Sequence, residues 1–146
     1  MDIVGFLNDV TGGDLLLWKV IGATVVFLLA GLQVFLAARF WEVTGFPPMK
    51  PTLAAKLHRI NGRVALTLAV IVAVSCIAAP AGPVSPVRVL LHSIFGTFLF
   101  VVLAVKFTLL RVLRKGERVL PYIGTTVFLT FAAIWATSVA DYVAAR

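Results

Sequence analysis

The sequence predicts an all-α integral membrane protein that folds as a four-helix transmembrane bundle. Of the 146 residues, 61% are hydrophobic and only 13% are charged, whereas a soluble domain is roughly half apolar and about a quarter charged. The apolar residues are grouped into long runs, and about 20 consecutive apolar residues suffice for a helix to cross a bilayer. We expect helices because a helix satisfies its own backbone hydrogen bonds in lipid.

Helices are expected in a single transmembrane domain covering residues 1–146, at about residues 15–41, 52–79, 87–113 and 120–142. Asp14 precedes the first helix and can cap its free amides. The segment Gly45–Pro51 ends that helix, because proline cannot continue a helix and disfavours it in the preceding residue. A tight turn is expected at Pro80–Pro86, and the basic loop Arg114–Arg118 separates the last two helices.

The distribution of basic residues predicts the orientation. Of the 13 lysines and arginines, all but Lys19, Arg88 and Arg146 flank the first and third connections between helices. Because such residues stay in the cytoplasm, we expect both basic loops there, both termini outside, and an up-down-up-down course through the bacterial inner membrane. Lys19 is expected to snorkel from its helix end. The acidic segment before Asp14 lacks a basic flank and is not expected to be a cleavable signal peptide.

Several classes of function are disfavoured by the composition. The net charge of +7 is carried mostly by loops, as topology requires, so we expect no nucleic-acid partner. The single cysteine, Cys76, excludes an internal disulfide. The spans contain no acid–base pair, metal motif or acidic residue, which argues against a transporter and against an enzyme acting alone. The chain is at most a redox subunit.

The two histidines, His58 and His92, carry the main chemistry that this sequence offers. A neutral imidazole in a helical bundle is a natural axial ligand for haem iron. Each histidine is followed four residues later by a glycine, Gly62 or Gly96, on the same helix face, which leaves space for a ring. Cations that can neutralise haem propionates or bind a quinone are Arg59, Arg63, Arg88 and Lys106.

Depth in the bilayer separates the two histidines. His58 lies about 24 residues before the middle of the turn and His92 about 10 after it, which corresponds to heights that differ by roughly 21 Å at ~1.5 Å per residue. We therefore expect that they do not share one haem within a chain. His92 should lie level with Ser75 and Cys76, and His58 level with Lys106.

Small residues recur at three- and four-residue spacing along the second helix, at Gly62, Ala65, Ala69, Ala73 and Cys76. Such a stripe lets another helix backbone approach closely. We interpret it as a helix-packing face.

Two motifs resemble known membrane proteins. The segment His58-Arg-Ile-Asn-Gly-Arg63 resembles the His-Arg-x-x-Gly-Arg opening of a helix in ferric-reductase-like and related b-type membrane cytochromes. Arg88 to His92, followed by Gly96, Lys106 and Arg111, more closely resembles a group of small bacterial four-helix membrane proteins of unknown function that are suspected of binding haem. The resemblance covers roughly Leu57 to Tyr142.

That group usually carries a further histidine late in the second helix, just before a cysteine, and the matching pair here is Ser75–Cys76. The resemblance implies a haem level with His92, while the serine removes the second ligand. Three alternatives follow: a ligand from another subunit, a five-coordinate haem on His92, or no haem.

The leading hypothesis is a b-type cytochrome-like membrane subunit for electron transfer, with haem b on His92 and His58 as a second metal ligand, across an oligomer interface. The rival hypothesis is a haem-free structural or accessory subunit of a larger membrane complex that binds lipid or quinone. Both hypotheses place the chain in the lipid bilayer as a homo-oligomer or beside other membrane subunits.

Overall fold

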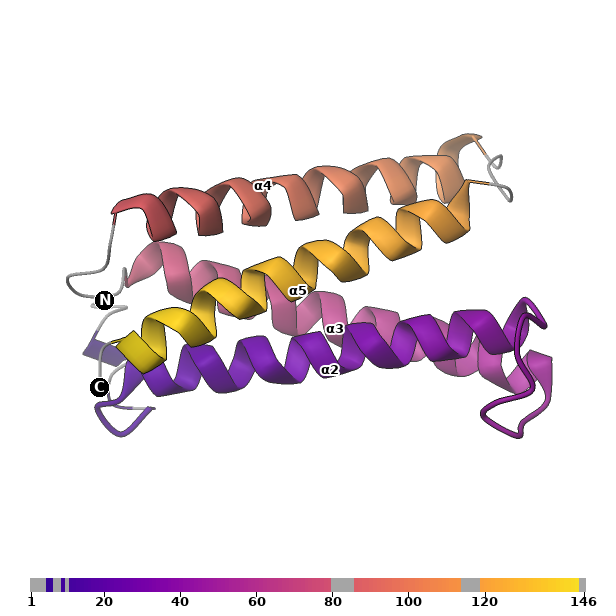
Figure 1. The fold of residues 1–146 in the computed structure, drawn as a ribbon, viewed down its shortest axis with the longest axis horizontal. Coiled ribbons are helices and arrows are strands. Elements are labelled where there is room, and N and C mark those ends of the chain that lie inside the picture. Colours follow the sequence, from indigo (N-terminus) through magenta and orange to yellow (C-terminus); the bar gives the residue numbers. More distant parts are fainter. Residues whose placement is uncertain (1–4, 7–8, 10, 80–85, 114–118, 145–146) are drawn as a thin grey trace.

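The chain forms four long helices in a computed structural model that describes residues 5–6, 9, 11–79, 86–113 and 119–144. They are α2 (Leu15–Phe40), α3 (Pro51–Ala78), α4 (Pro86–Thr108) and α5 (Leu120–Ala144), and a short π-helix, η1 (Leu109–Leu113), continues α4 (Figure 1). The described part of the chain contains no strand. All four helices are long and apolar enough to cross a membrane.

These findings confirm the prediction of an all-α, four-helix membrane protein, and the helix bounds agree closely with those expected. The expected turn at Pro80–Pro86 and the basic loop Arg114–Arg118 lie outside the described residues, apart from Pro86. The start of α2 and the end of α5 lie at the same end of the bundle (Figure 1).

The helix starts follow from local sequence. The side chain of Asp14 accepts a hydrogen bond from the amide of Leu17 at 2.8 Å, which confirms the predicted cap of α2. Proline at the first position of α3, Pro51, removes an amide that would have no partner there.

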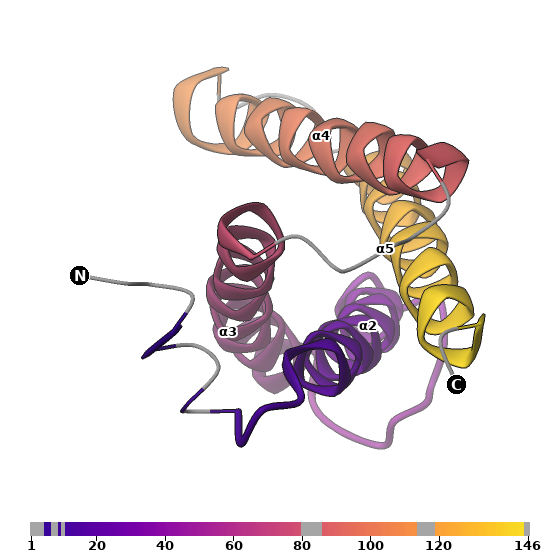
Figure 2. The ribbon, with the colours of Figure 1, turned by 90° about the vertical axis from the view of Figure 1, so that its left-hand side faces the viewer.

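The helices pack in the order α3–α2–α5–α4, and the ring is open between α3 and α4. Helix α2 contacts both α3 and α5, and α4 contacts α5, whereas α3 and α4 barely touch (Figure 2). Only 6% of the most apolar stretch of α4 is buried, against 17% in each of the other three helices. Helix α4 is therefore the least covered element of the bundle.

The buried core is small and lies where α2 meets its neighbours. Its members are Val26, Ala30, Ala69, Leu99 and Phe131.

Aromatic rings extend this core along the contact between α2 and α5. The ring of Phe27 is stacked between Phe128, at 5.7 Å, and Trp135, at 5.0 Å between ring centroids. Large apolar side chains elsewhere point outward. A soluble monomer rarely exposes so much apolar surface, whereas lipid covers it in a membrane protein.

Side chain–backbone hydrogen bonds join α2 to α3. The Gln33 side chain donates to the carbonyl of His58 at 2.9 Å, and the ring nitrogen Nδ1 of His58 donates to the carbonyl of Gln33 at 3.1 Å. One turn on, the buried side chain of Asn61 donates to the carbonyl of Leu29 at 2.9 Å. A Cβ added to Gly62 would lie 2.4 Å from Gln33 Nε2, so the glycine leaves the room that this pairing needs.

We therefore expect Gly62→Ala to be less stable than Gly124→Ala by about 1 kcal/mol, the net value of a typical hydrogen bond, because the new methyl group displaces the Gln33 amide from His58 while the gain in helix propensity is shared by both variants. The measurement is thermal or denaturant unfolding of the detergent-purified protein. Gly124→Ala is the matched control, since a Cβ at Gly124 meets nothing within 4 Å. Equal stability of the two variants would contradict this account of the α2–α3 contact.

Candidate functional site

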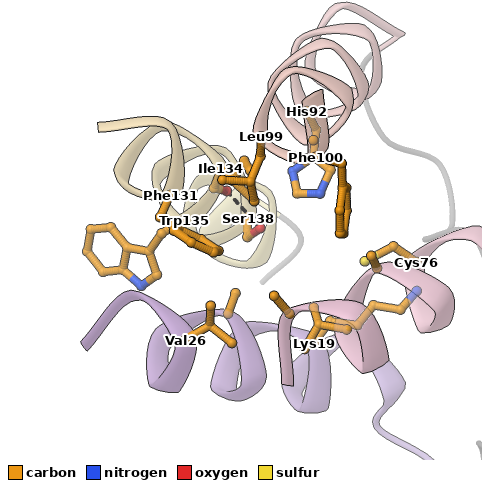
Figure 3. Close-up of a pocket in the computed structure, with 15 residues that line it drawn as sticks. Lys19, Val26, Cys76, His92, Leu99, Phe100, Phe131, Ile134, Trp135 and Ser138 are labelled. Atoms are coloured by element: carbon orange, nitrogen blue, oxygen red, sulfur yellow. Dashed lines mark hydrogen bonds between the residues drawn. The ribbon is translucent and has the colours of Figure 1, made fainter. Parts of the chain in front are cut away.

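All four helices contribute to one apolar cavity, which contains about 590 Å³ of space including the part that is open to the outside. It extends from the end of the bundle where α3 finishes and α4 begins toward the middle of the helices. Its lining residues are Lys19, Ala23 and Val26 of α2; Ala69, Val72, Ala73 and Cys76 of α3; His92, Gly96, Leu99 and Phe100 of α4; and Phe131, Ile134, Trp135 and Ser138 of α5 (Figure 3).

His92 presents its imidazole to this cavity from α4, and α5 orients the ring. Nδ1 of His92 lies 3.0 Å from Oγ1 of Thr137. Oγ1 of Thr137 also lies 2.8 Å from the carbonyl of Ile134, to which its hydroxyl donates. In that arrangement Thr137 accepts from Nδ1 of His92, and the neutral ring has its lone pair on Nε2, the tautomer that binds a metal through Nε2.

The wall opposite His92 comes from α3 and carries Cys76, whose thiol faces the cavity (Figure 3). His92 and Cys76 thus line the same cavity. Ser75 does not line it: the side chain is buried, and its hydroxyl donates to the carbonyl of Ile71 at 2.9 Å.

Lys19 corrects an expectation. Its side chain does not snorkel away from the bundle; it is only 8% exposed and lies beside the cavity. Its ammonium donates to the carbonyl of Ala79, the residue that ends α3. A cation is favoured there, because the last carbonyls of a helix lack partners and carry partial negative charge.

Helices α3 and α4 both line the cavity, although few of their backbone positions lie close together. A Cβ added to Gly96 meets nothing within 4 Å. The ring of Phe100 projects from α4 between His92 and Cys76 in the view of Figure 3. Gly96 and Phe100 thus border the cavity beside His92.

His58 lies outside this cavity. Its hydrogen bonds join it to α2, and its ring lies edge-on to Phe40 at 5.3 Å between centroids. Gly62, the glycine that follows it, accommodates Gln33 instead of a ligand. Although the two His-x-x-x-Gly patterns look alike in sequence, only the second belongs to the cavity.

The predicted cations divide between the two ends. Nη1 of Arg88 donates to the carbonyl of Ala140 at 3.3 Å, near the cavity end. Lys106 lies in the last turn of α4, toward the other end of the bundle. Arg59 and Arg63 are exposed on α3.

Sequence reasoning missed the part of the site that comes from α5. Thr137 orients His92, while Trp135 and Ser138 line the cavity. Nε1 of Trp135 also donates to Oγ1 of Thr24 at 3.0 Å. The available signal was the presence of Thr137 and Ser138 in an otherwise apolar span, because polar side chains within a bundle usually bond across helices.

Comparison with known proteins places the sequence in a family. Residues 6–145 match a family described as a family of unknown function, DUF6529. The chain belongs to this family. No curated protein and no solved structure matches it. Membership of DUF6529 agrees with the expected likeness to small four-helix proteins of unknown function, whereas no comparison supports a relationship to ferric reductases or b-type cytochromes.

The chemistry available in this DUF6529 cavity is that of a single metal-binding imidazole in apolar surroundings, with a thiol and a lysine nearby. The described residues contain no group of three or more histidine, cysteine, aspartate or glutamate side chains that could hold a metal ion. Iron or another metal bound here would therefore be held partly by the protein and partly by donor atoms of the cofactor that carries it.

We expect Gly96→Leu to fill part of the cavity and to slow the modification of Cys76 by N-ethylmaleimide several-fold in native membranes. The reason is that Gly96 and Cys76 line the same cavity, so a leucine side chain takes up space beside the thiol. Gly124→Leu is the matched control, because it also adds bulk in open space but does not border the cavity. Equal labelling rates in the two variants would show that the thiol is reached by another route.

Proposed function

We propose that this protein is a b-type cytochrome-like membrane subunit for electron transfer, with His92 as the iron ligand of a haem b. The observation that carries the proposal is the hydrogen bond between His92 and Thr137, which sets the metal-binding tautomer of a histidine that faces an apolar cavity. A ligating histidine in proteins almost always donates its other ring nitrogen to such a partner.

The surroundings of His92 fit one face of a haem. The walls are apolar and aromatic, and Gly96 leaves open space one turn from the histidine. Arg88, four residues before His92, is the predicted cation for a propionate at this end. A bound haem supplies one-electron chemistry; His92 holds the iron, Thr137 orients the ring of His92, and the apolar walls exclude water.

His58 lies outside the cavity, so His92 is the histidine that would hold the iron there. A haem at this site would be five-coordinate or would take its sixth ligand from another subunit. His58 remains the proposed ligand across an oligomer interface. The cations Arg59, Arg63 and Lys106 then serve propionates or a quinone at that end.

The test is an absorption spectrum of the detergent-purified protein, oxidised in air and then reduced with dithionite. We expect a Soret band that His92→Ala removes and His58→Ala retains. Thr137→Val should weaken haem binding roughly 10- to 100-fold, as loss of an orienting partner typically does, and Thr137→Ser should restore it.

The spectrum also separates the alternatives for the second ligand. Sharp α and β bands after reduction indicate a six-coordinate haem, whose second ligand comes from a neighbouring chain. Broad bands indicate a five-coordinate haem on His92. A colourless protein, or a Soret band unchanged in His92→Ala, overturns the proposal.

A second function is favoured by the packing of α4. Because α4 contacts α5 but barely touches α3, one side of the bundle is open to another transmembrane helix. In this alternative the protein is a haem-free accessory subunit of a larger membrane complex, and the cavity binds lipid or quinone. It predicts a colourless protein that purifies with other subunits.

We further propose that both basic connections lie in the cytoplasm of a bacterial cell and both termini outside, in an up-down-up-down course through the inner membrane. The proposal is supported by the distribution of lysine and arginine.

In a Cys76→Ser background, we expect a membrane-impermeant maleimide to label Asp9→Cys in spheroplasts without permeabilisation. Gly45→Cys should react only after the membrane is permeabilised. Both positions are exposed, so a difference in labelling reports the side of the membrane on which each residue lies. The reverse labelling pattern would mean the opposite orientation.

A further inference from the structure

The cavity beside His92 changes from polar to apolar along the bundle. Each helix supplies one lysine, thiol, imidazole or hydroxyl toward the end where α3 finishes and α4 begins (Figure 1): Lys19, Cys76, His92 and Ser138. Seven residues farther into the bundle, each helix supplies an apolar side chain of the buried core: Val26, Ala69, Leu99 and Phe131. On each helix the two sets are separated by two turns, or roughly 10 Å at ~1.5 Å per residue. The cavity therefore suits a ligand with one polar and one apolar edge.

Lys19 is the charged member of the polar set. It is buried, and its side chain extends from α2 toward Cys76, on the side of the cavity opposite His92 (Figure 3). An ammonium has three hydrogens to donate, and within the described residues only the carbonyl of Ala79 accepts one of them. A carbonyl does not neutralise a charge, and burying a charge without a counter-ion is unfavourable. Lys19 can therefore bind an anionic group of a ligand in the cavity.

The hydrogen bond to Ala79 also determines where that anionic group would lie. Ala79 follows Cys76 by three residues and ends α3, so the ammonium is held closer to the end of the bundle than the thiol is. Arg88 lies near the same end, where it donates to the carbonyl of Ala140. The acidic residue that precedes α2, Asp14, is exposed and caps that helix through the amide of Leu17. An anion is therefore favoured at the end of the cavity and not in its apolar interior.

We propose that Lys19 binds a propionate carboxylate of the haem and so determines which edge of the haem faces the end of the bundle. This inference rests on the proposed function and extends it, because an iron ligand on His92 does not by itself fix the rotation of the haem about that ligand. One edge of haem b carries two ionised propionates and the opposite edge is apolar. These edges match the polar and apolar sets of side chains. The ammonium of Lys19 has hydrogens left for a carboxylate while it keeps its bond to Ala79.

The alternative is a purely structural role, in which Lys19 only stabilises the end of α3. Both roles are compatible with the hydrogen bond to Ala79. They differ in one respect, since only the binding role depends on the charge of the ligand. A ligand without charged propionates therefore separates them.

The test compares the affinity of the full-length, detergent-purified protein for haem and for haem dimethyl ester, in which both propionates are neutral. Each pigment is titrated into protein produced without haem, and binding is measured from the Soret band. We expect Lys19→Met to weaken haem binding roughly tenfold, at the lower end of the value of a hydrogen bond to a charged group, and to leave the affinity for the ester within about twofold. Lys19→Arg, which keeps the charge, should retain most of the affinity for haem.

The matched control is Lys56→Met, which removes the same charge from an exposed position near the start of α3 and should leave the ratio of the two affinities unchanged. Each variant is measured with both pigments, so a change in its folding or in the packing of α3 affects the two affinities alike.

Equal losses of affinity for haem and for the ester in Lys19→Met would assign Lys19 to the fold and overturn the inference. An unchanged affinity of Lys19→Met for haem would overturn it as well. In both cases a Soret band that depends on His92 leaves the proposed function standing. Wild-type protein that binds neither pigment would overturn the proposed function and this inference with it.

Discussion

The bilayer requires polar side chains within the helices to find partners inside the bundle, and the α2–α3 pair meets most of this requirement. Lys19 bonds to Ala79 near one end, Asn61 to Leu29 in the middle, and Gln33 to His58 toward the other end. Residue numbers rise along α2 from Lys19 to Gln33, while the numbers of their partners fall along α3 from Ala79 to His58. These hydrogen bonds therefore hold the two helices in one antiparallel register.

The open side of the bundle follows from the way the remaining helices are added. Helix α5 packs on α2 through aromatic rings, and α4 packs on α5, so α4 has no close contact with α3. The cavity with His92 is lined by all four helices and lies toward the end of the bundle where α4 begins.

Two similar sequence patterns have different roles because of their neighbours. His58 and Gly62 face α2, where the glycine makes room for Gln33 and the histidine completes a hydrogen-bonded pair. His92 and Gly96 face the gap, where open space lies beside the glycine and Thr137 orients the histidine. A histidine followed by a glycine one turn later is thus compatible with helix packing as well as with a ligand site.

The sequence by itself determined the membrane class, the four helices and the cap at Asp14. These depend on local properties: the length of apolar runs, the positions of prolines and the residue before each helix. Only the tertiary structure decided that Lys19 turns inward to the end of α3, that Thr137 hydrogen-bonds His92, and that α3 and α4 have few close backbone contacts. Those features depend on which faces of non-adjacent helices meet, and a uniformly apolar helix surface carries little information about its rotation.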